Sequence, residues 1–444
     1  MAAPAARRPP IQRLPSAPPS QDWHATGRHG DLLLAGPWLA SGEVADVYVA
    51  DGRITAVTPP GSGPAVAERL DLDGWLLLPA PAEPHAHLDK AFTAARAPNP
   101  AGDLPGAIAA WRAYRPLLAY SDVVERATRA AHLQLANGAT AVRSHVDVGE
   151  DIGLRALDPL IEVREALRGQ LTVQLVAFAA PPVTGEAGSA NRELLRAALE
   201  RGADVVGGCP SLDPDPAGCI ELCLGLAEAF RRPLDLHVDE TLDPNVQWLP
   251  HLAQVVGSRR LPYGATASHC VSLGVQAPRV AEWIAATVAG ARLAVVCCPQ
   301  TNLFLQGRDS PRAPRGLTAL RALLAAGATV AAGGDNLQDP FNAVGRGDPL
   351  ETASLLVAAG HLTPREAYAA VTEGARAAMG LEEVRVEAGF PAELLAVRAA
   401  SVEEAVAAAP GDRLVVHDGR LVSRTTVTHE LFDATPAPTA RSVP

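Results

Sequence analysis

One pattern restricts the fold of this chain more than any other feature: from residue 76 to residue 335, short apolar runs alternate with segments of helical spacing. This alternation is typical of β/α units, in which a helix covers each buried parallel strand. Several intervening helices end beside a glycine, as at Gly138 and Gly202, a common stop signal. We predict eight strands, at residues 76–87, 140–147, 171–178, 204–209, 234–240, 265–270, 293–299 and 329–335. Eight successive units predict an α/β fold, a (β/α)8 TIM-type barrel, with a doubly wound open sheet as the alternative.

Two similar β-rich segments flank the predicted barrel. Each has apolar runs on both sides of an Asp-Gly turn signal, Asp51-Gly52 in one and Asp418-Gly419 in the other. Their similarity predicts a small β-sandwich domain formed from both chain ends. The predicted organisation is a disordered tail at 1–28, the first part of the small domain at 29–76, the barrel at 77–387, the second part of the small domain at 388–433, and a disordered tail at 434–444.

Composition narrows the classes of partner. The net charge of −11, from 38 basic and 49 acidic side chains, lacks the clustered positive charge of a nucleic-acid binder. No apolar run reaches the ~18 residues that a membrane span needs. The first 28 residues lack the continuous apolar region of a secretory signal, although a cleaved targeting segment stays open. We expect a cytoplasmic protein that binds neither nucleic acid nor a membrane.

Histidines gather at the predicted strand ends, where a barrel carries its active site. His85 and His87 are two residues apart, so both side chains point to the same side of an extended strand. Of the twelve histidines in the chain, five lie at such ends: His85, His87, His145, His237 and His269. Together with Asp335, which ends the eighth predicted strand, imidazoles of this kind are suitable ligands for a borderline divalent metal such as Zn or Fe.

Glu240 follows His237 by three residues, at the end of the predicted fifth strand. A carboxyl group beside a metal can move protons during hydrolysis. The alternative is a structural role, because a glutamate in the first turn of a helix is favoured by the helix dipole. We favour the proton-transfer role because of the neighbouring histidines.

Seven stretches follow one another at barrel spacing: Glu83-Pro-His85-Ala-His87-Leu-Asp-Lys90, Ser144-His145-Val-Asp147-Val, Val173-Gln174-Leu-Val-Ala-Phe178, Gly202-Ala-Asp-Val-Val-Gly-Gly208, Leu236-His237-Val-Asp-Glu240, Thr266-Ala-Ser-His269 and Gly334-Asp335-Asn336-Leu-Gln-Asp339-Pro340. In this order they resemble the amidohydrolase superfamily, and within it the cytosine deaminase-like branch. The chain is also similar to the N-isopropylammelide isopropylamidohydrolases. The resemblance extends from the end of the first β-segment to the C-terminal β-segment.

The resemblance implies a mononuclear site with one divalent metal ion per subunit, Zn or Fe. The implied ligands are His85, His87, His237 and Asp335. Dinuclear members of the superfamily use a carboxylated lysine on the fourth strand, whereas Lys90 is the only lysine here and follows the first strand. A bridged metal pair is therefore not expected.

The resemblance also implies a reaction, the hydrolytic deamination of a cytosine-like nitrogen heterocycle. Metal-activated hydroxide would add to the C–NH2 carbon, and ammonia would leave. Glu240 would carry a proton to the ring nitrogen and to the leaving amine, and His269 would orient the attacking water. Asp335 would also accept a proton from the water, and Gln174 would bind the amide edge of the ring. A homo-oligomer that binds a small heterocyclic substrate is expected.

Two departures from the branch concern the substrate. Asn336 stands where a second aspartate is usual, and Phe341 stands where a tryptophan is usual. We expect both to contact substrate, and an amide that donates and accepts reads a different ring edge from a carboxylate. The alternatives are an N-alkyl triazine or a cyclic amide as substrate, or a non-catalytic amidohydrolase-fold subunit. His145 and Asp147 match the branch without an assigned step.

Overall fold

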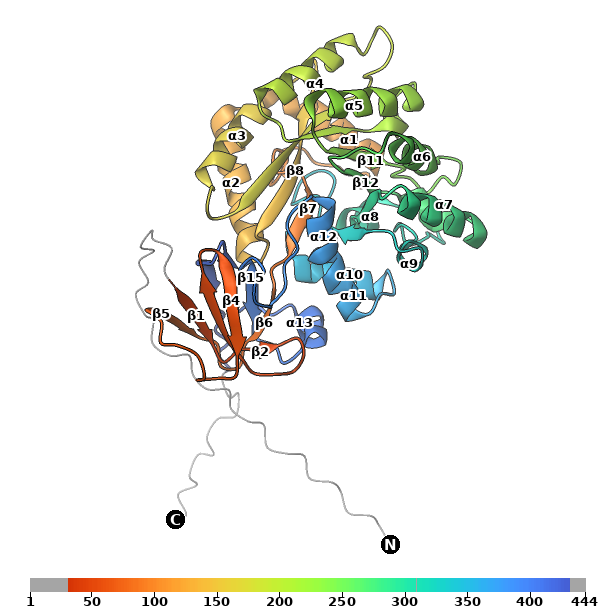
Figure 1. Cartoon of the computed structure of the whole chain (residues 1–444). Coiled ribbons are helices and arrows are strands. Elements are labelled where there is room, and N and C mark those ends of the chain that lie inside the picture. Colours follow the sequence, from red (N-terminus) through yellow and green to blue (C-terminus); the bar gives the residue numbers. More distant parts are fainter. Residues whose placement is uncertain (1–30, 309, 432–444) are drawn as a thin grey trace, which may run out of the picture.

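The computed structural model describes residues 31–308 and 310–431 (Figure 1). The predicted tails, 1–28 and 434–444, lie outside these ranges. Within them, eight parallel strands form one sheet in sequential order. They are β7 (Ala82–Ala86), β8 (Ala141–Val148), β9 (Thr172–Ala179), β10 (Val205–Gly208), β11 (Leu234–Val238), β12 (Ala265–His269), β13 (Ala294–Cys297) and β14 (Val330–Ala332). Asp335 N–H donates to His85 O at 2.9 Å, which joins the first and last strands and confirms the closed TIM-type barrel.

Helices surround the barrel strands (Figure 1). They are α1 (Leu104–Tyr114), α2 (Tyr120–Ala136), α3 (Leu157–Ala166), α4 (Ser189–Arg201), α5 (Pro216–Phe230), α6 (Leu249–Arg259), α7 (Pro278–Gly290), α8 (Pro299–Leu305), α9 (Leu320–Ala325), α10 (Pro349–Ala358), α11 (Pro364–Val371) and α12 (Glu373–Ala378). Short 3-10 turns occur at η1 (Arg115–Leu117), η2 (Pro210–Leu212) and η3 (Val271–Val275). No helix in the described part of the chain has the length and apolar character needed to cross a membrane.

Polar side chains that point into the barrel alternate along the strands with apolar side chains that face the helices. In β8 the residues Val142, Val146 and Val148 belong to the core shared with the helices. The intervening Arg143 and His145 are buried on the other face of the strand, inside the barrel. β11 and β12 repeat this alternation. The barrel interior is therefore partly polar, and its polar side chains need partners within the protein.

A small β-sandwich packs beside the barrel (Figure 1). One sheet has the order β4-β3-β1-β5 and the other the order β17-β16-β15-β6-β2. A common core containing Leu34, Val47, Leu77, Leu394 and Val416 lies between them. The elements are β1 (Leu32–Ala35), β2 (Trp38–Leu39), β3 (Asp46–Ala50), β4 (Arg53–Thr58), β5 (Glu68–Asp71), β6 (Leu76–Pro79), β15 (Leu394–Val397), α13 (Val402–Ala408), β16 (Arg413–His417) and β17 (Arg420–Thr425). The predicted small domain from both chain ends is confirmed.

The predicted first barrel strand, 76–87, is in fact two strands. β6 pairs antiparallel with β15 and belongs to the small domain, whereas β7 begins the barrel at Ala82. Pro79 and Pro81 lie at the break. A proline has no backbone N–H for a ladder hydrogen bond, which favours a break between the two strands at this point.

A buried ion pair joins the barrel to the small domain. Arg376 on α12 donates to Glu393 Oε2 at 3.1 Å and to Thr140 Oγ1 at 3.0 Å. His417 Nδ1 lies 2.9 Å from the same Glu393 oxygen. Burial raises the pKa of Glu393, but the hydrogen bond and charge of His417 and the charge of Arg376 outweigh burial and lower this pKa below its usual value.

We expect Glu393→Gln to lower the free energy of unfolding by about 1–3 kcal/mol at pH 7, the range for hydrogen bonds to charged groups. A carboxyl whose folded-state pKa is lowered stabilises the protein above its unfolded pKa of about 4.3, and this contribution is lost as the pH falls through the folded pKa. Denaturant titrations of both proteins from pH 7 to pH 3 should show the gap narrowing below about pH 4. A gap of constant size would contradict this role for the charge.

Candidate active site

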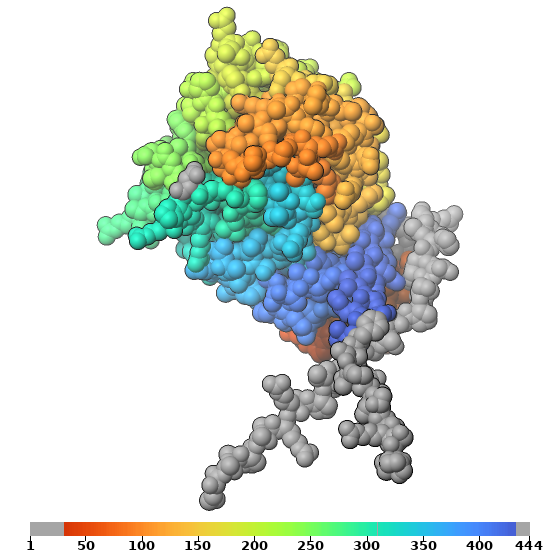
Figure 2. Space-filling view, turned by 180° about the vertical axis from the view of Figure 1, so that it is seen from behind, coloured from red at the N-terminus to blue at the C-terminus, as the bar shows by residue number. Residues whose placement is uncertain are grey.

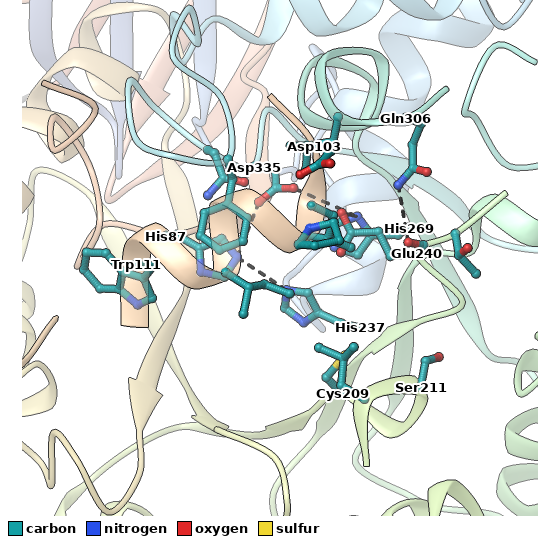
Figure 3. A pocket seen from close by; sticks show the side chains of 18 of the residues that line it. His87, Asp103, Trp111, Cys209, Ser211, His237, Glu240, His269, Gln306 and Asp335 are labelled. Atoms are coloured by element: carbon teal, nitrogen blue, oxygen red, sulfur yellow. Dashed lines mark hydrogen bonds and ion pairs between the residues drawn. The ribbon is translucent and has the colours of Figure 1, made fainter. Parts of the chain in front are cut away.

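A cavity of about 660 Å³ opens at the carboxyl ends of the barrel strands. Figure 3 shows the predicted residues His87, His237, Glu240, His269 and Asp335 together in this pocket. His85 lies buried behind them, with its ring centroid 4.6 Å from that of His237. The structure therefore brings the six predicted metal and catalytic side chains to one place, although they come from four strands far apart in sequence.

Two of these residues have an unusual backbone. His269 has a φ of 72° and Asp335 a φ of 64°. Both values lie in the left-handed region, which residues other than glycine rarely adopt. Such conformations cost about 1–3 kcal/mol each and persist only where the surroundings enforce them. For Asp335, the hydrogen bond to His85 O holds the chain in a sharp turn after β14. The turn places its carboxylate beside the histidines of β7.

The donor atoms converge with metal-site spacing. Asp335 Oδ1 lies 3.4 Å from His87 Nε2 and 3.7 Å from His85 Nε2, and His237 Nε2 lies 3.4 Å from His87 Nε2. Donors on a tetrahedral ion, with bonds of about 2.0–2.1 Å, stand about 3.4 Å apart. Both carboxylate oxygens of Asp335 and Nε2 of His85 are buried without a hydrogen-bond partner among the described residues.

The imidazoles are in the protonation state that binds metals. Burial, followed by the charges of nearby groups, lowers the pKa of His85, His87 and His237 well below the usual range. Neutral imidazole is the form that ligates a cation. Buried polar atoms without partners are costly, so a cation at their centre gives these donors a partner that the polypeptide does not.

Other donors lie close to His85. His145, Cys298 and His269 also fall within ligand spacing of it. Burial raises the pKa of Cys298 well above its usual value, which keeps the thiol protonated. Thiolate, rather than thiol, is the metal ligand. His145 lacks a partner on both ring nitrogens within the part of the chain that the structure describes.

A buried chain of hydrogen bonds fixes the ring of His85. His85 Nδ1 lies 2.9 Å from Ser268 Oγ, and Ser268 Oγ donates to Asp235 Oδ1 at 2.9 Å. Arg143 donates to the other oxygen of Asp235 at 2.8 Å. These contacts hold the ring with Nε2 directed toward Asp335, as the outer partners of metal-binding histidines commonly do.

Gln174 lies outside the pocket of this structure, so its placement does not support the predicted contact with substrate. Its Oε1 accepts from Arg143 Nε at 2.9 Å, and its Nε2 donates to Met379 O at 3.0 Å. Gln174 is the third residue of β9, near the end of the strand that is remote from the mouth. Phe178, near the other end of β9, lines the pocket instead, with its ring centroid 4.4 Å from that of His237.

Glu240 is held as an acid at the pocket wall. Burial raises its pKa to about 8. The preceding Asp239 accepts the N–H groups of Trp248 and Leu249, which fixes the loop that turns Glu240 inward. The first helix after β11 begins only at Leu249, so the helix-dipole alternative for Glu240 is excluded.

Asn302 on α8 links Glu240 to His269. Its Nδ2 donates to His269 Nδ1 at 3.2 Å and to Glu240 Oε1 at 3.4 Å. Because Nδ1 of His269 accepts this bond, the ring carries its proton on Nε2. Burial lowers the pKa of His269 to about 3, so the ring is neutral. Its Nε2–H is a donor without a partner in the described residues.

Asn336 and Phe341 both line the pocket, as predicted from their positions after the eighth strand. Asn336 Nδ2 donates to Asp339 Oδ2 at 2.8 Å, and its Oδ1 accepts from Thr301 at 3.3 Å. These bonds fix the orientation of the amide. Phe341 is half-buried and supplies an aromatic surface.

The sequence did not single out several pocket residues. Trp111, Asp103 and Leu242 come from helices or loops, where no strand-end rule applies. The same holds for Asn302, which is buried behind the pocket and contacts Glu240 and His269. Phe178 and Cys209 carried a signal, because each ends a predicted strand.

A closed barrel with converging imidazole and carboxylate donors beside a buried carboxylic acid defines a class, the barrel hydrolases that act on carbon–nitrogen bonds. A family model described as the Amidohydrolase family matches residues 112–423, and the chain belongs to that family. Members of the family bind a divalent metal, and a cluster of candidate ligands is present here. The resemblance to the cytosine deaminase-like branch is confirmed by the relatives of the chain.

One relative is the pterin deaminase of Rhizobium rhizogenes, which is 32% identical over 88% of this chain and 90% of its own length. Among solved structures, the 5-methylcytosine deaminase of Klebsiella pneumoniae is similar with a TM-score of 0.83, at 28% identity over 91% of this chain and all of that one. The N-isopropylammelide isopropylaminohydrolase of Burkholderia multivorans has a TM-score of 0.77, at 30% identity over 89% of this chain and 99% of that one. All of these proteins act on nitrogen heterocycles.

Proposed function

We propose that this protein is a hydrolytic deaminase of an aminated two-ring heterocycle of the pterin type. The observation that carries the proposal is Glu240, a carboxylic acid with a side chain only 13% exposed, whose pKa is raised to about 8 by burial and which lies 3.5 Å from His269 beside the donor cluster. An acid that is protonated near neutral pH can deliver a proton to a ring nitrogen. Loss of an amine from an aromatic ring needs such a proton.

The metal is held, in this proposal, by His85, His87, His237 and Asp335. The spacing of their donor atoms and the two unpartnered oxygens of Asp335 support this set. Three imidazoles and one carboxylate suit Zn or Fe. When bound, a divalent ion lowers the pKa of water and so supplies a nucleophile near neutral pH.

The side chains divide the remaining tasks. Asp335 has a second oxygen, Oδ2, 4.0 Å from His269, and this oxygen accepts the proton of the attacking water. His269 donates its Nε2–H to the oxygen that forms on the attacked carbon. Glu240 protonates the adjacent ring nitrogen. The resulting carboxylate then takes up the proton of the hydroxyl group on the attacked carbon and passes it to the leaving amine, so that ammonia departs as the carbonyl forms. Phe178 and Phe341 provide aromatic surfaces for the flat ring.

Two observations favour a two-ring substrate over a cytosine-type base. The cavity of about 660 Å³ leaves most of its space empty around a single small ring. The relative at 32% identity is a pterin deaminase. Removal of an alkylamine from a triazine is the second candidate, supported by the similarity to the Burkholderia enzyme.

Ammonia release from a panel of aminated heterocycles tests the proposal. The panel contains pterin, cytosine, 5-methylcytosine, isoguanine and aminotriazines, and N-isopropylammelide is assayed separately for amine release. Pterins are expected to give the highest kcat/KM. Turnover of N-isopropylammelide alone would favour the second candidate. Silence across all substrates, with metal bound to the protein, would overturn the deaminase proposal.

A further inference from the structure

The seam where the barrel closes, between β7 and β14, contains a buried carboxyl group that takes no part in the proposed reaction. Other neighbouring barrel strands pair in ladders, whereas among the described residues β7 and β14 share one isolated bridge, between Ala86 and Asp335. Glu83 lies on β7 at this seam and is 3% exposed. Its Oε1 accepts the N–H of His85 at 3.1 Å, and its Oε2 accepts the N–H of Gly334 at 2.8 Å. One side chain therefore joins the first strand to the turn that follows the last.

The sequence of β7 explains why a side chain is needed at this point. Pro84 has no N–H for a ladder hydrogen bond. The pairing of β7 with β8 also shifts its register between Glu83 and Ala86. Buried backbone N–H groups need partners. At this irregular point Glu83 supplies a partner on each side of the seam.

The turn after β14 has the shape needed to receive Glu83. A Cβ at Gly333 would stand 2.2 Å from Glu83 Oε1, and a Cβ at Gly334 would stand 3.2 Å from Oε2. The first distance is far below van der Waals contact, so glycine at position 333 is what lets the backbone approach the carboxyl group. The two glycines before Asp335 and the glutamate before His85 are therefore parts of one arrangement.

The surroundings of Glu83 are its burial and two backbone N–H groups. Burial raises its pKa to about 8, and the N–H groups of Gly334 and His85 lower this pKa. In either protonation state both carboxyl oxygens keep lone pairs, so both can accept an N–H. A buried polar group is costly unless it is hydrogen-bonded. Its presence in the closing seam indicates a role besides packing.

The bonds of Glu83 lead directly to Asp335. The N–H groups of two successive residues after β14 are both held by β7: Gly334 donates to Glu83 Oε2, and Asp335 donates to His85 O at 2.9 Å. Asp335 has a φ of 64°, a conformation that persists only where the surroundings enforce it. With the turn held in this way, Asp335 Oδ1 lies 3.4 Å from His87 Nε2 (Figure 3).

Further contacts continue the seam toward the surface. Phe92 N–H donates to Leu337 O at 2.9 Å, and Ala94 N–H donates to Gln338 O at 2.9 Å. Figure 2 shows the orange segment that follows β7 in contact with the light-blue segment that follows β14 on this face of the molecule. These bonds come after Asp335 in the chain, so they hold the loops of the pocket, whereas Glu83 holds the turn before it.

We propose that Glu83 is a positioning residue that holds the turn after β14, so that the carboxylate of Asp335 faces the histidines of the metal-binding cluster. It acts through the backbone of Gly334 and takes no place among the proposed ligands. The inference rests on the proposed function only in taking Asp335 as a metal ligand. A carboxyl group that merely closed the barrel would stabilise the fold without affecting metal binding selectively.

Glu83→Gln is the test variant, because an amide keeps the shape of the side chain but accepts with one atom only. Its NH2 group would face one of the two backbone N–H groups. Asp46→Asn is the matched control. Asp46 is also 3% exposed and accepts two backbone N–H groups, from Gly36 at 3.0 Å and from Gly61 at 2.8 Å, but it lies on β3 in the small domain.

Three measurements are made on each protein. Zinc affinity is measured by competition with a chromophoric chelator, and Tm by thermal unfolding of the metal-free protein. Visible absorption of the cobalt-loaded protein reports the geometry of the ligands. We expect Glu83→Gln to weaken zinc binding about 10- to 100-fold, the range for outer partners of metal ligands, and to alter the cobalt spectrum. Asp46→Asn should keep the wild-type affinity and spectrum, whatever its loss of Tm.

Gly333→Ala is a second variant that leaves Glu83 in the chain. Its methyl group would displace the carboxyl group from the turn, so zinc binding should weaken and the cobalt spectrum should change in the same direction as in Glu83→Gln. If Glu83→Gln fails to fold, Gly333→Ala decides.

Wild-type zinc affinity and a wild-type cobalt spectrum in Glu83→Gln, or in Gly333→Ala where it decides, would overturn the inference. So would an equal loss of affinity in Asp46→Asn at an equal loss of Tm. Neither readout needs a substrate. Failure of the wild-type protein to deaminate any heterocycle would therefore count against the proposed function alone, whereas failure to bind zinc or cobalt would count against both.

Discussion

Replacing Glu240 with glutamine is expected to lower kcat for deamination by about 10²–10⁴-fold, the usual contribution of a general acid or base. Glutamine has nearly the same shape and keeps an acceptor for the Asn302 amide, but it cannot deliver a proton to a ring nitrogen. KM should change little, because the loss falls on the transition state. Steady-state kinetics on the preferred substrate of the panel measures both.

The matched control is Glu228→Gln, which alters an exposed glutamate paired with Arg259 on the outside of the barrel. It should retain wild-type kinetics. Metal content must be equal in Glu240→Gln and in the wild type, since Glu240 is outside the proposed ligand set. A Glu240→Gln enzyme with more than half of the wild-type kcat would show that another group carries the proton.

Removing the metal is expected to reduce deamination by roughly 10³–10⁵-fold, because a cation at such a site contributes several kcal/mol to the transition state. Chelation followed by addition of Zn or Fe should restore activity at one ion per chain. Tm should also fall on chelation, because an ion that binds only the folded chain stabilises it. Activity that survives chelation at zero measured metal would contradict the proposed chemistry.

Two histidine variants then test which donors hold the ion. His237→Gln should lose bound metal and not recover activity when metal is added. His145→Gln should keep one ion, although His145 is equally buried and its ring centroid lies 4.0 Å from that of His85. Loss of the ion in His145→Gln as well would move the site toward the group formed by His85, His145 and His237.

Strand periodicity explains why much of the site was predictable. His85, His87, His237, His269 and Asp335 end buried strands, and in a closed parallel barrel all such ends meet at one mouth. That inference needs only local pattern. The predicted start of the first barrel strand was wrong because an apolar run does not show which sheet it joins. Its first part is β6, which pairs with β15 of the small domain.

Gln174 was predicted to contact substrate although it lies near the start of β9, and the pocket opens at the ends of the strands. It stands four residues before Phe178, so at about 3.3 Å per residue it lies about 13 Å below the mouth. The roles of Asn302 and Trp111 could not be predicted from the sequence for a different reason. Their roles depend on how α8 and α1 pack against the barrel, and no periodicity within either helix records that packing.

The shared sheet of the small domain has a consequence for synthesis on the ribosome. β6 cannot complete its ladder until β15 emerges, because Leu78 pairs with Leu395 and the whole barrel is translated between them. Until then the apolar faces of β1 and β3 lack the residues that cover them, among them Leu394 and Val416. Strand pairs this far apart in the sequence form slowly, and their apolar surface stays exposed until they form. We therefore expect a chain that terminates ahead of β15 to aggregate more readily than the full-length protein.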